Sequence, residues 1–199
     1  MRKRRRVTSK PRSNPIFGRL VRSDPGNAGW QRDLSVSYVK VGDVQQAQGD
    51  LKAALKSYSD SLAIRDRLAQ SDPGNAGWQR DLSVSYDRIG DVQMAQGDLK
   101  AALKSYSDDL AIAERLAQSD PGNAGWQRDL SVVYGKLADA YRKSNETVKA
   151  RDALAAGRAV IRKLVDQHPD QAQWKEDLAW FDARIAEREK TSPKKKPVR

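Results

Sequence analysis

The chain has 199 residues, no cysteine and a formal net charge of +11. The lack of cysteine excludes a disulfide framework and thiolate chemistry, and it favours a reducing compartment. No apolar run reaches the roughly 20 residues of a membrane-spanning helix, and the basic start does not lead into the apolar segment of a secretory signal. We therefore expect a cytoplasmic protein without membrane contact.

The positive charge is concentrated at the two ends of the chain. Residues 1–22 contain nine basic and no acidic side chains, and residues 190–199 contain five basic and no acidic ones. The basic, proline-containing segments 1–15 and 191–199 are therefore predicted to be disordered tails. Tails of this kind are suited to non-specific contact with nucleic-acid phosphates, to a localisation signal, or to solubility alone.

One stretch, DPGNAGWQRDLSVSY, organises the chain. It occurs from Asp24, Asp72 and Asp120, at intervals of 48 residues, and only the third copy departs from it, at Val133. A diverged fourth copy keeps Trp174 at the same spacing. The first two 48-residue units are identical at 41 positions. A period of this length indicates a stack of like structural units.

Each unit is predicted to form two helices. Asn27 is a suitable N-cap for the first helix, and Asp50 for the second. Gly49 between them favours a left-handed turn, and Pro73 forbids continuation of the second helix. The predicted units are 24–71, 72–119 and 120–167, followed by a capping helix at 171–190, all within one repeat domain at 16–190.

The segment Ile16–Ser23 matches Ile64–Ser71, the end of a second helix. This match suggests that the array begins in the middle of a repeat. One interpretation is that the chain is a regulatory fragment of a larger multidomain protein.

The packing positions of these helix pairs resemble those of the tetratricopeptide repeat (TPR) family. The run VGDVQQAQGDLKAALKSYSDSLAI, preceded by Tyr38, carries the family's bulky residue, hydrophobic–glycine pair, second glycine, alanine and aromatic. The corresponding residues are Tyr38, Val41, Gly42, Gly49, Ala54 and Tyr58 in the first unit, with Tyr86, Ile89, Gly90, Gly97, Ala102 and Tyr106 in the second.

The 48-residue period is longer than the usual period of the family, about 34 residues, so the resemblance is to a long-helix variant. It implies an all-α helix-turn-helix repeat solenoid, a TPR-like superhelix of about three and a half repeats with a C-terminal capping helix. It also implies that the first helices line a concave groove for a peptide or helix of a partner.

The groove implied by the resemblance mixes apolar and acidic side chains. Asp43, Asp91 and Asp139 form a ladder that is either attractive to a basic segment or simply a solvated face. The implied groove residues are Val36, Val39, Asp43, Gln46 and Ala47, then Val84, Asp87, Asp91, Met94 and Ala95, and finally Val132, Gly135, Asp139, Arg142, Lys143 and Trp180.

No catalytic, metal-binding or cofactor-binding set is recognisable in the sequence. His168 is the single histidine, and the glycine turns between helices do not form a phosphate-cradling loop. Trp30, Trp78, Trp126 and Trp174 could stack on bases, but their place in the apolar stripe favours core packing. We expect no enzymatic activity and no cofactor.

The leading hypothesis from the sequence is a protein–protein interaction scaffold that binds a protein or peptide partner in its groove. The alternatives are a nucleic-acid-associated protein that binds through its basic tails, and the regulatory fragment described above.

Overall fold

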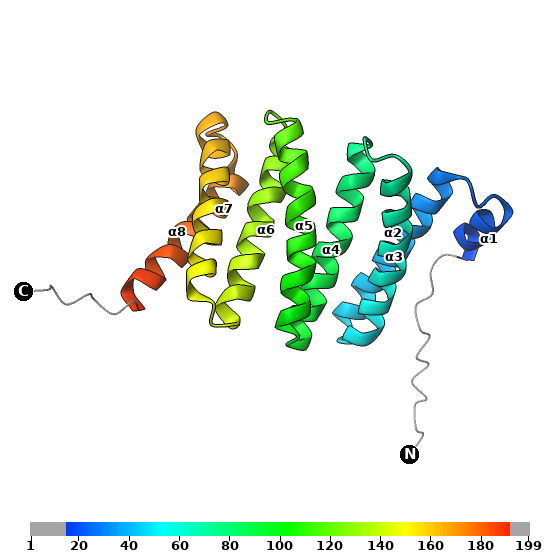
Figure 1. Ribbon diagram of the computed structural model, residues 1–199, viewed down its shortest axis with the longest axis horizontal. Coiled ribbons are helices and arrows are strands. Elements are labelled where there is room, and N and C mark those ends of the chain that lie inside the picture. Colours follow the sequence, from blue (N-terminus) through cyan, green and yellow to red (C-terminus); the bar gives the residue numbers. More distant parts are fainter. Residues whose placement is uncertain (1–14, 192–199) are drawn as a thin grey trace, which may run out of the picture. The chain divides into compact units, whose positions relative to one another are not determined.

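The computed structural model describes residues 15–191 and contains, within them, eight α-helices and no strand (Figure 1). The predicted all-α helical repeat solenoid class is therefore confirmed. The two predicted tails lie outside the described residues, apart from Pro15 and Thr191. The helices are α1 (Pro15–Ser23), α2 (Ala28–Ala47), α3 (Leu51–Ser71), α4 (Ala76–Gln96), α5 (Leu99–Ser119), α6 (Ala124–Lys143), α7 (Thr147–Gln167) and α8 (Ala172–Thr191).

The helix starts follow the predicted capping chemistry. The side chain of Asn27 accepts a hydrogen bond of 3.0 Å from the backbone N–H of Trp30, and Asp50 accepts one of 3.0 Å from Ala53. Each cap satisfies a backbone donor that the first turn of a helix leaves without an intrahelical partner. Asn123 repeats this arrangement at the start of α6.

The turns within the helix pairs require a left-handed backbone. Gly49 and Gly97 have φ values of 79° and 80°, as predicted for the glycine of this turn. The third pair has no glycine there, and Asn145 adopts a φ of 61° instead. Asparagine tolerates this region better than most residues, which explains how the third turn keeps the same form.

The chain divides into two compact units, Met1–Gln96 and Gly97–Arg199, so the division falls inside the second predicted helix pair. The single repeat domain at 16–190 stays a prediction.

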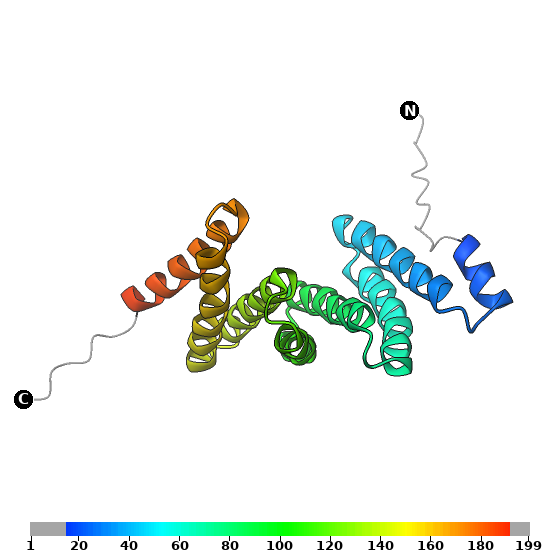
Figure 2. The ribbon, with the colours of Figure 1, turned by 90° about the horizontal axis from the view of Figure 1, so that it is seen from above.

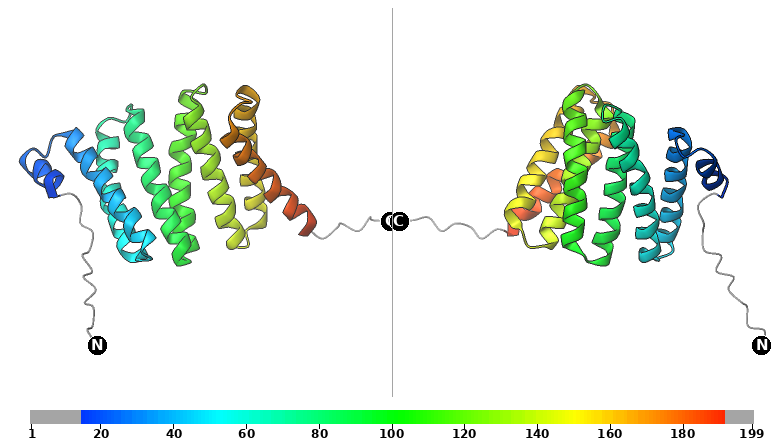
Figure 3. Two further views of the ribbon diagram at one scale, coloured as in Figure 1. Left: turned by 180° about the vertical axis from the view of Figure 1, so that it is seen from behind. Right: turned by 45° about the vertical axis from the view of Figure 1, so that its right-hand side comes forward.

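In the first unit, a short α1 lies beside the start of α2, and α3 packs against both α2 and α4 (Figure 3). Ala54 and Tyr58 of α3 form a core cluster with Ile89 and Val92 of α4. Gly42 faces Tyr58 so closely that a Cβ atom there would lie 2.5 Å from the ring. The glycine is therefore required by the aromatic ring that packs on it.

In the second unit, α6 packs against α5 and α7, and α8 runs obliquely across α7 (Figure 2). Phe181 of α8 is buried and takes the space that Gly157 of α7 leaves open, since a Cβ at Gly157 would lie 2.5 Å from the phenyl ring. Leu154 and Ile161 complete the buried face of α7.

Successive first helices are also joined by ion pairs within each unit. Arg32 Nε of α2 lies 2.5 Å from Asp81 Oδ2 of α4, and Arg128 Nε of α6 lies 2.7 Å from Asp177 Oδ2 of α8. Both arginines are partly exposed, and pairs of this kind typically contribute about 0–1 kcal/mol. These ion pairs fix the register of neighbouring first helices more than they contribute to the free energy of folding.

The four repeated tryptophans were predicted to pack in the core, but they are less buried than that prediction requires. Trp30, Trp78, Trp126 and Trp174 are all half-buried, and none belongs to the buried core. The physical reason is their position in the opening turn of a first helix, at the end of the helix pair, where solvent reaches one side of each ring.

Candidate functional site

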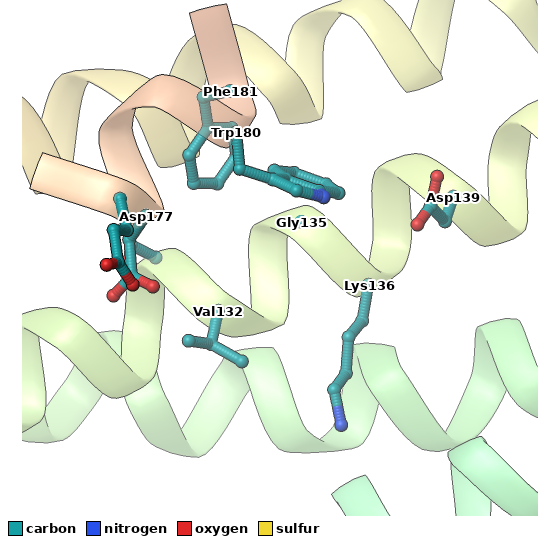
Figure 4. A pocket seen from close by; sticks show the side chains of 9 residues that line it. Val132, Gly135, Lys136, Asp139, Asp177, Trp180 and Phe181 are labelled. Atoms are coloured by element: carbon teal, nitrogen blue, oxygen red, sulfur yellow. The ribbon is translucent and has the colours of Figure 1, made fainter. Parts of the chain in front are cut away.

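The candidate site is a hollow between α6 and α8 in the second unit. Gly135 of α6 provides the space, because a side chain there would begin 3.2 Å from Cζ3 of Trp180. The ring of Trp180 lies over this glycine and meets Phe181 edge to face, with ring centroids 4.9 Å apart (Figure 4). Phe181 is buried, so it anchors the exposed tryptophan in one orientation.

The hollow has a volume of about 400 Å³ and a mainly apolar floor. Two large apolar side chains in it face solvent, Val132 at 37% exposure and Trp180 at 36%. We call this site the α6–α8 hollow. It is lined by Ser131, Val132, Gly135, Lys136, Asp139, Glu176, Asp177, Trp180 and Phe181.

Charged side chains form the rim of the hollow. Asp177 is held by Arg128, and Asp139 Oδ1 lies 3.5 Å from Arg142 Nε. Glu176 is exposed on the first turns of α8. Three carboxylates and one ammonium, that of Lys136, line the hollow, and two of the carboxylates are paired with arginines beside it.

Two cations near the hollow contact aromatic rings. Lys136 points away from the ring of Trp180, and its ammonium lies 6.0 Å from the centroid of Tyr106 (Figure 4). The guanidinium of Arg184 lies 5.3 Å from the centroid of Trp180, which supports the exposed ring from its own helix.

The residues predicted for the third part of the groove fall into two groups. Asp139 and Trp180 line the α6–α8 hollow, together with Val132 and Gly135 of the same column. Arg142 and Lys143 are exposed at the end of α6 and do not line it.

Several residues predicted for the groove in the first unit make contacts within that unit. The carboxylate of Asp43 accepts a 2.7 Å hydrogen bond from the hydroxyl of Tyr58, whose oxygen also lies 2.9 Å from Gln46 Oε1. Arg88 Nη1 lies 3.8 Å from Asp43. Asp43 therefore links α2 to α3 and to α4, which weighs against its role in a ladder that attracts a basic partner.

The remaining predicted residues of the first unit are half-buried along α2 and α4. Val39 packs against the core cluster rather than facing an open groove. Val36, Val84, Asp87, Asp91 and Met94 are the other half-buried ones, whereas Ala47 and Ala95 are exposed.

Three residues of α8 that line the α6–α8 hollow were not predicted from the sequence. Glu176 and Asp177 precede Trp180 by one helical turn, and Phe181 follows it directly. Residues three or four apart share a helix face, so extending the Trp180 column back by one turn finds both acids. The interdigitation of Phe181 with Gly157 has no comparable sequence signal.

The buried position of Tyr58 has an electrostatic consequence. Burial, and then the hydrogen bond to Asp43, raise the pKa of the Tyr58 hydroxyl above its ordinary value. The neutral phenol thus acts as a structural donor.

Within the described part of the chain, no three His, Cys, Asp or Glu side chains gather closely enough to hold a metal ion. No helix in residues 15–191 is both long enough and apolar enough to cross a membrane.

Comparison with known proteins shows similarity only at the level of structure. No protein-family model matches the chain, and no curated protein matches it. The structure of BtubC (BKLC) from P. vanneervenii is similar, with a TM-score of 0.55, 15% sequence identity, and coverage of 96% of this chain and 74% of that one.

Two further solved structures share less. The de novo designed helical repeat protein DHR64 has a TM-score of 0.39 at 11% identity, covering 89% of this chain and 90% of the design. The DHF119 filament has a TM-score of 0.39 at 10% identity, covering 87% of this chain and 88% of that one. At its low identity, the similarity to BtubC extends to the helical fold alone.

Proposed function

We propose that this chain is a non-catalytic scaffold for protein–protein interaction, and that its second unit binds an apolar side chain of a partner peptide or helix in the α6–α8 hollow. The observation that carries the proposal is the pair of exposed large apolar side chains, Val132 and Trp180, which line one hollow of about 400 Å³. Full burial of one Leu or Phe side chain contributes about 1.5–3 kcal/mol.

The placement of the hollow supports this proposal. Both α6 and α8 are first helices of their repeats, and the resemblance to the TPR family implies that first helices carry the partner surface. The assignment to that family, and a cytoplasmic setting suggested by the cysteine-free composition, belong to the same proposal.

The rim indicates the chemistry of the partner. Asp139 and Glu176 place carboxylates beside an apolar floor. A partner with an aromatic or branched apolar anchor, followed or preceded by Lys or Arg, would satisfy both features. Recognition of a few anchors on one face is how helices bind to grooves in general.

The experiment is a binding screen of the full chain against peptides tiled from the proteome of its own organism. We expect the bound peptides to share an apolar anchor next to a basic residue. Val132→Asp should weaken these peptides at least tenfold, because a charge would be buried against the anchor.

The control is Val148→Asp, which introduces the same change at a valine that is 63% exposed and lies outside the hollow. Its binding should equal that of the wild type. If the peptides bind equally well to Val132→Asp, or no peptide binds at all, the hollow is not a partner site and the proposal is wrong.

A further inference from the structure

The α6–α8 hollow has carboxylates at both of its ends. Asp139 lies at one end and Asp177 at the other, and the ring of Trp180 lies between them (Figure 4). Glu176 directly precedes Asp177 on α8 and also lines the hollow. The apolar floor therefore has negative charge on two opposite sides.

These carboxylates differ in how firmly the chain itself holds them. The Asp177 side chain is only 20% exposed and lies 2.7 Å from Arg128 Nε. Asp139 makes a looser contact of 3.5 Å with Arg142 of its own helix, and exposed pairs of this kind contribute little. The Glu176 carboxylate lies 3.5 Å from Gln173 Nε2, an uncharged donor. Asp139 and Glu176 are thus the two carboxylates that can take up a cation of a partner.

Three cations around the hollow have contacts of their own. Arg128 is engaged by Asp177. The ammonium of Lys136 lies 6.0 Å from the ring centroid of Tyr106 and points away from Trp180 (Figure 4). The guanidinium of Arg184 lies 5.3 Å from the centroid of Trp180 and 3.7 Å from Glu187. Charge complementarity at Asp139 and Glu176 therefore favours a partner that brings two cations.

The apolar part of the hollow offers room for one anchor. Val132 and Trp180 are the exposed large apolar side chains that line it. Helices that bind in grooves use several anchors along one face, spaced at i, i+3 or i+4, and i+7. A single anchor is better suited to an extended segment.

The indole N–H of Trp180 also favours an extended segment. Within residues 15–191 this group makes no hydrogen bond, since the contacts of the ring are those with Gly135, Phe181 and Arg184. An extended segment has backbone carbonyls that can accept from it, whereas the carbonyls of a helix are already bonded within the helix.

We infer that the α6–α8 hollow binds an extended partner segment whose single apolar anchor stands between two basic residues, each two positions away. Residues i, i+2 and i+4 of an extended chain point to the same side and span about 13 Å. From Val132 to Asp139, α6 rises about 10 Å. Flexible lysine or arginine side chains on both sides of the anchor therefore reach both carboxylates.

This inference rests on the function proposed above and adds the conformation and the spacing of the partner motif. The test uses the full chain and the synthetic peptide SKSLSKS, in which leucine is the anchor. A titration followed by nuclear magnetic resonance measures the Kd. The indole N–H signal of Trp180, identified by its absence in Trp180→Phe, should shift as the peptide saturates the chain.

The charge of the peptide is then varied. The one-lysine peptides SKSLSSS and SSSLSKS should each bind about two- to fivefold less tightly, which is the contribution of one exposed ion pair. The acidic peptide SESLSES should not bind.

Substitutions in the chain assign each lysine to its carboxylate. Asp139→Asn and Glu176→Gln should each weaken SKSLSKS by the same factor, and each should leave unchanged the one-lysine peptide that lacks the matching lysine. The control is Asp166→Asn, which removes an exposed carboxylate of α7 outside the hollow and should not change the Kd.

Three results would overturn the inference. They are equal binding of the one-lysine and two-lysine peptides, full affinity in both Asp139→Asn and Glu176→Gln, and no binding of SKSLSKS. None of them decides the proposed function, which fails only if the peptide screen finds no peptide that depends on Val132. The two failures are therefore distinguishable.

Discussion

Two equivalent contacts, one in each unit, are built from opposite chemistry. In the first unit, Arg65 of α3 meets Ser85 of α4, with 3.2 Å between Nη1 and Oγ. The same repeat positions in the second unit hold Ile161 and Phe181, on α7 and α8. All four side chains are buried. One position in the stack thus accepts a hydrogen-bonded cation or a purely apolar pair.

The buried arginine is tolerated because its Nε and Nη1 groups have hydrogen-bond acceptors. Arg65 is 5% exposed, and it donates from Nε to Ser35 Oγ at 3.1 Å and from Nη1 to the carbonyl of Asp81 at 2.7 Å. Burial lowers the pKa of its guanidinium, which reflects the cost of removing the charge from water. The comparison teaches that caps and turns fix where each helix of a repeat begins and ends. An interior contact can then be polar or apolar, provided that its two partners match each other.

The largest loss of stability is expected when the apolar contact between Ile161 and Phe181 is removed. Phe181→Ala should destabilise the second unit by about 3–5 kcal/mol, because it removes a buried ring and leaves a cavity. Urea denaturation followed by circular dichroism measures the loss. A change below 1 kcal/mol would show that Phe181 is not a packing anchor.

A double-mutant cycle sharpens this result. Gly157→Ala alone should cost about 1–3 kcal/mol by overpacking, since its Cβ would lie 2.5 Å from the ring of Phe181. In the Phe181→Ala background the same substitution should cost less, because the clash with the ring is gone and alanine favours a helix, while the 2.9 Å approach to Tyr134 Cβ remains. Equal costs in both backgrounds would contradict the direct contact.

The polar contact between Arg65 and Ser85 can be replaced by an apolar one. Arg65→Ala should cost about 1–3 kcal/mol, through lost hydrogen bonds and packing. Adding Ser85→Val recreates the pair Ala113 and Val133, which is buried at the same repeat positions. The double variant should return to within about 1 kcal/mol of the wild type, since a packed apolar pair can replace a buried polar one. Urea denaturation measures both, and a double variant no better than Arg65→Ala would contradict the interchange.

The parts of the fold that depend on local chemistry were predictable from the sequence. Asn27, Asp50 and Gly49 mark helix ends by their own side chains or backbone freedom, so no knowledge of neighbours was needed. Arg65 carries no such local signal, because a charged residue is normally assigned to the surface. Its burial depends on Ser35 and Ser85, which are distant in sequence.

The candidate site was only partly predictable for the same reason. The resemblance to the TPR family implied the groove column that contains Asp139, and the 48-residue period extended that column to Trp180. The exposure of Val44 was not predictable from its repeat, since an equivalent valine is buried at position 92. What decides it is the length of the neighbouring helix.

The smallest predicted effect concerns a hydrogen bond between second and first helices in the second unit. The hydroxyl of Tyr134 donates to Glu114 Oε1 at 2.7 Å. In the first unit the residue equivalent to Glu114 is Asp66, one methylene shorter, and it accepts instead from Gln70 of its own helix. Tyr134→Phe should therefore cost about 0.5–1.5 kcal/mol at neutral pH by removing this bond.

The pH dependence tests the same contact. Burial, and then the hydrogen bond to Glu114, raise the pKa of Tyr134 from 10.0 to about 12. Its contribution is fully present below pH 10 and is lost between pH 10 and about 12, because the unfolded phenol releases its proton first. The stability gap between the wild type and Tyr134→Phe should thus shrink when urea denaturation is repeated at pH 11. A gap that stays constant would show that the buried phenol does not hold its proton more tightly than the unfolded one.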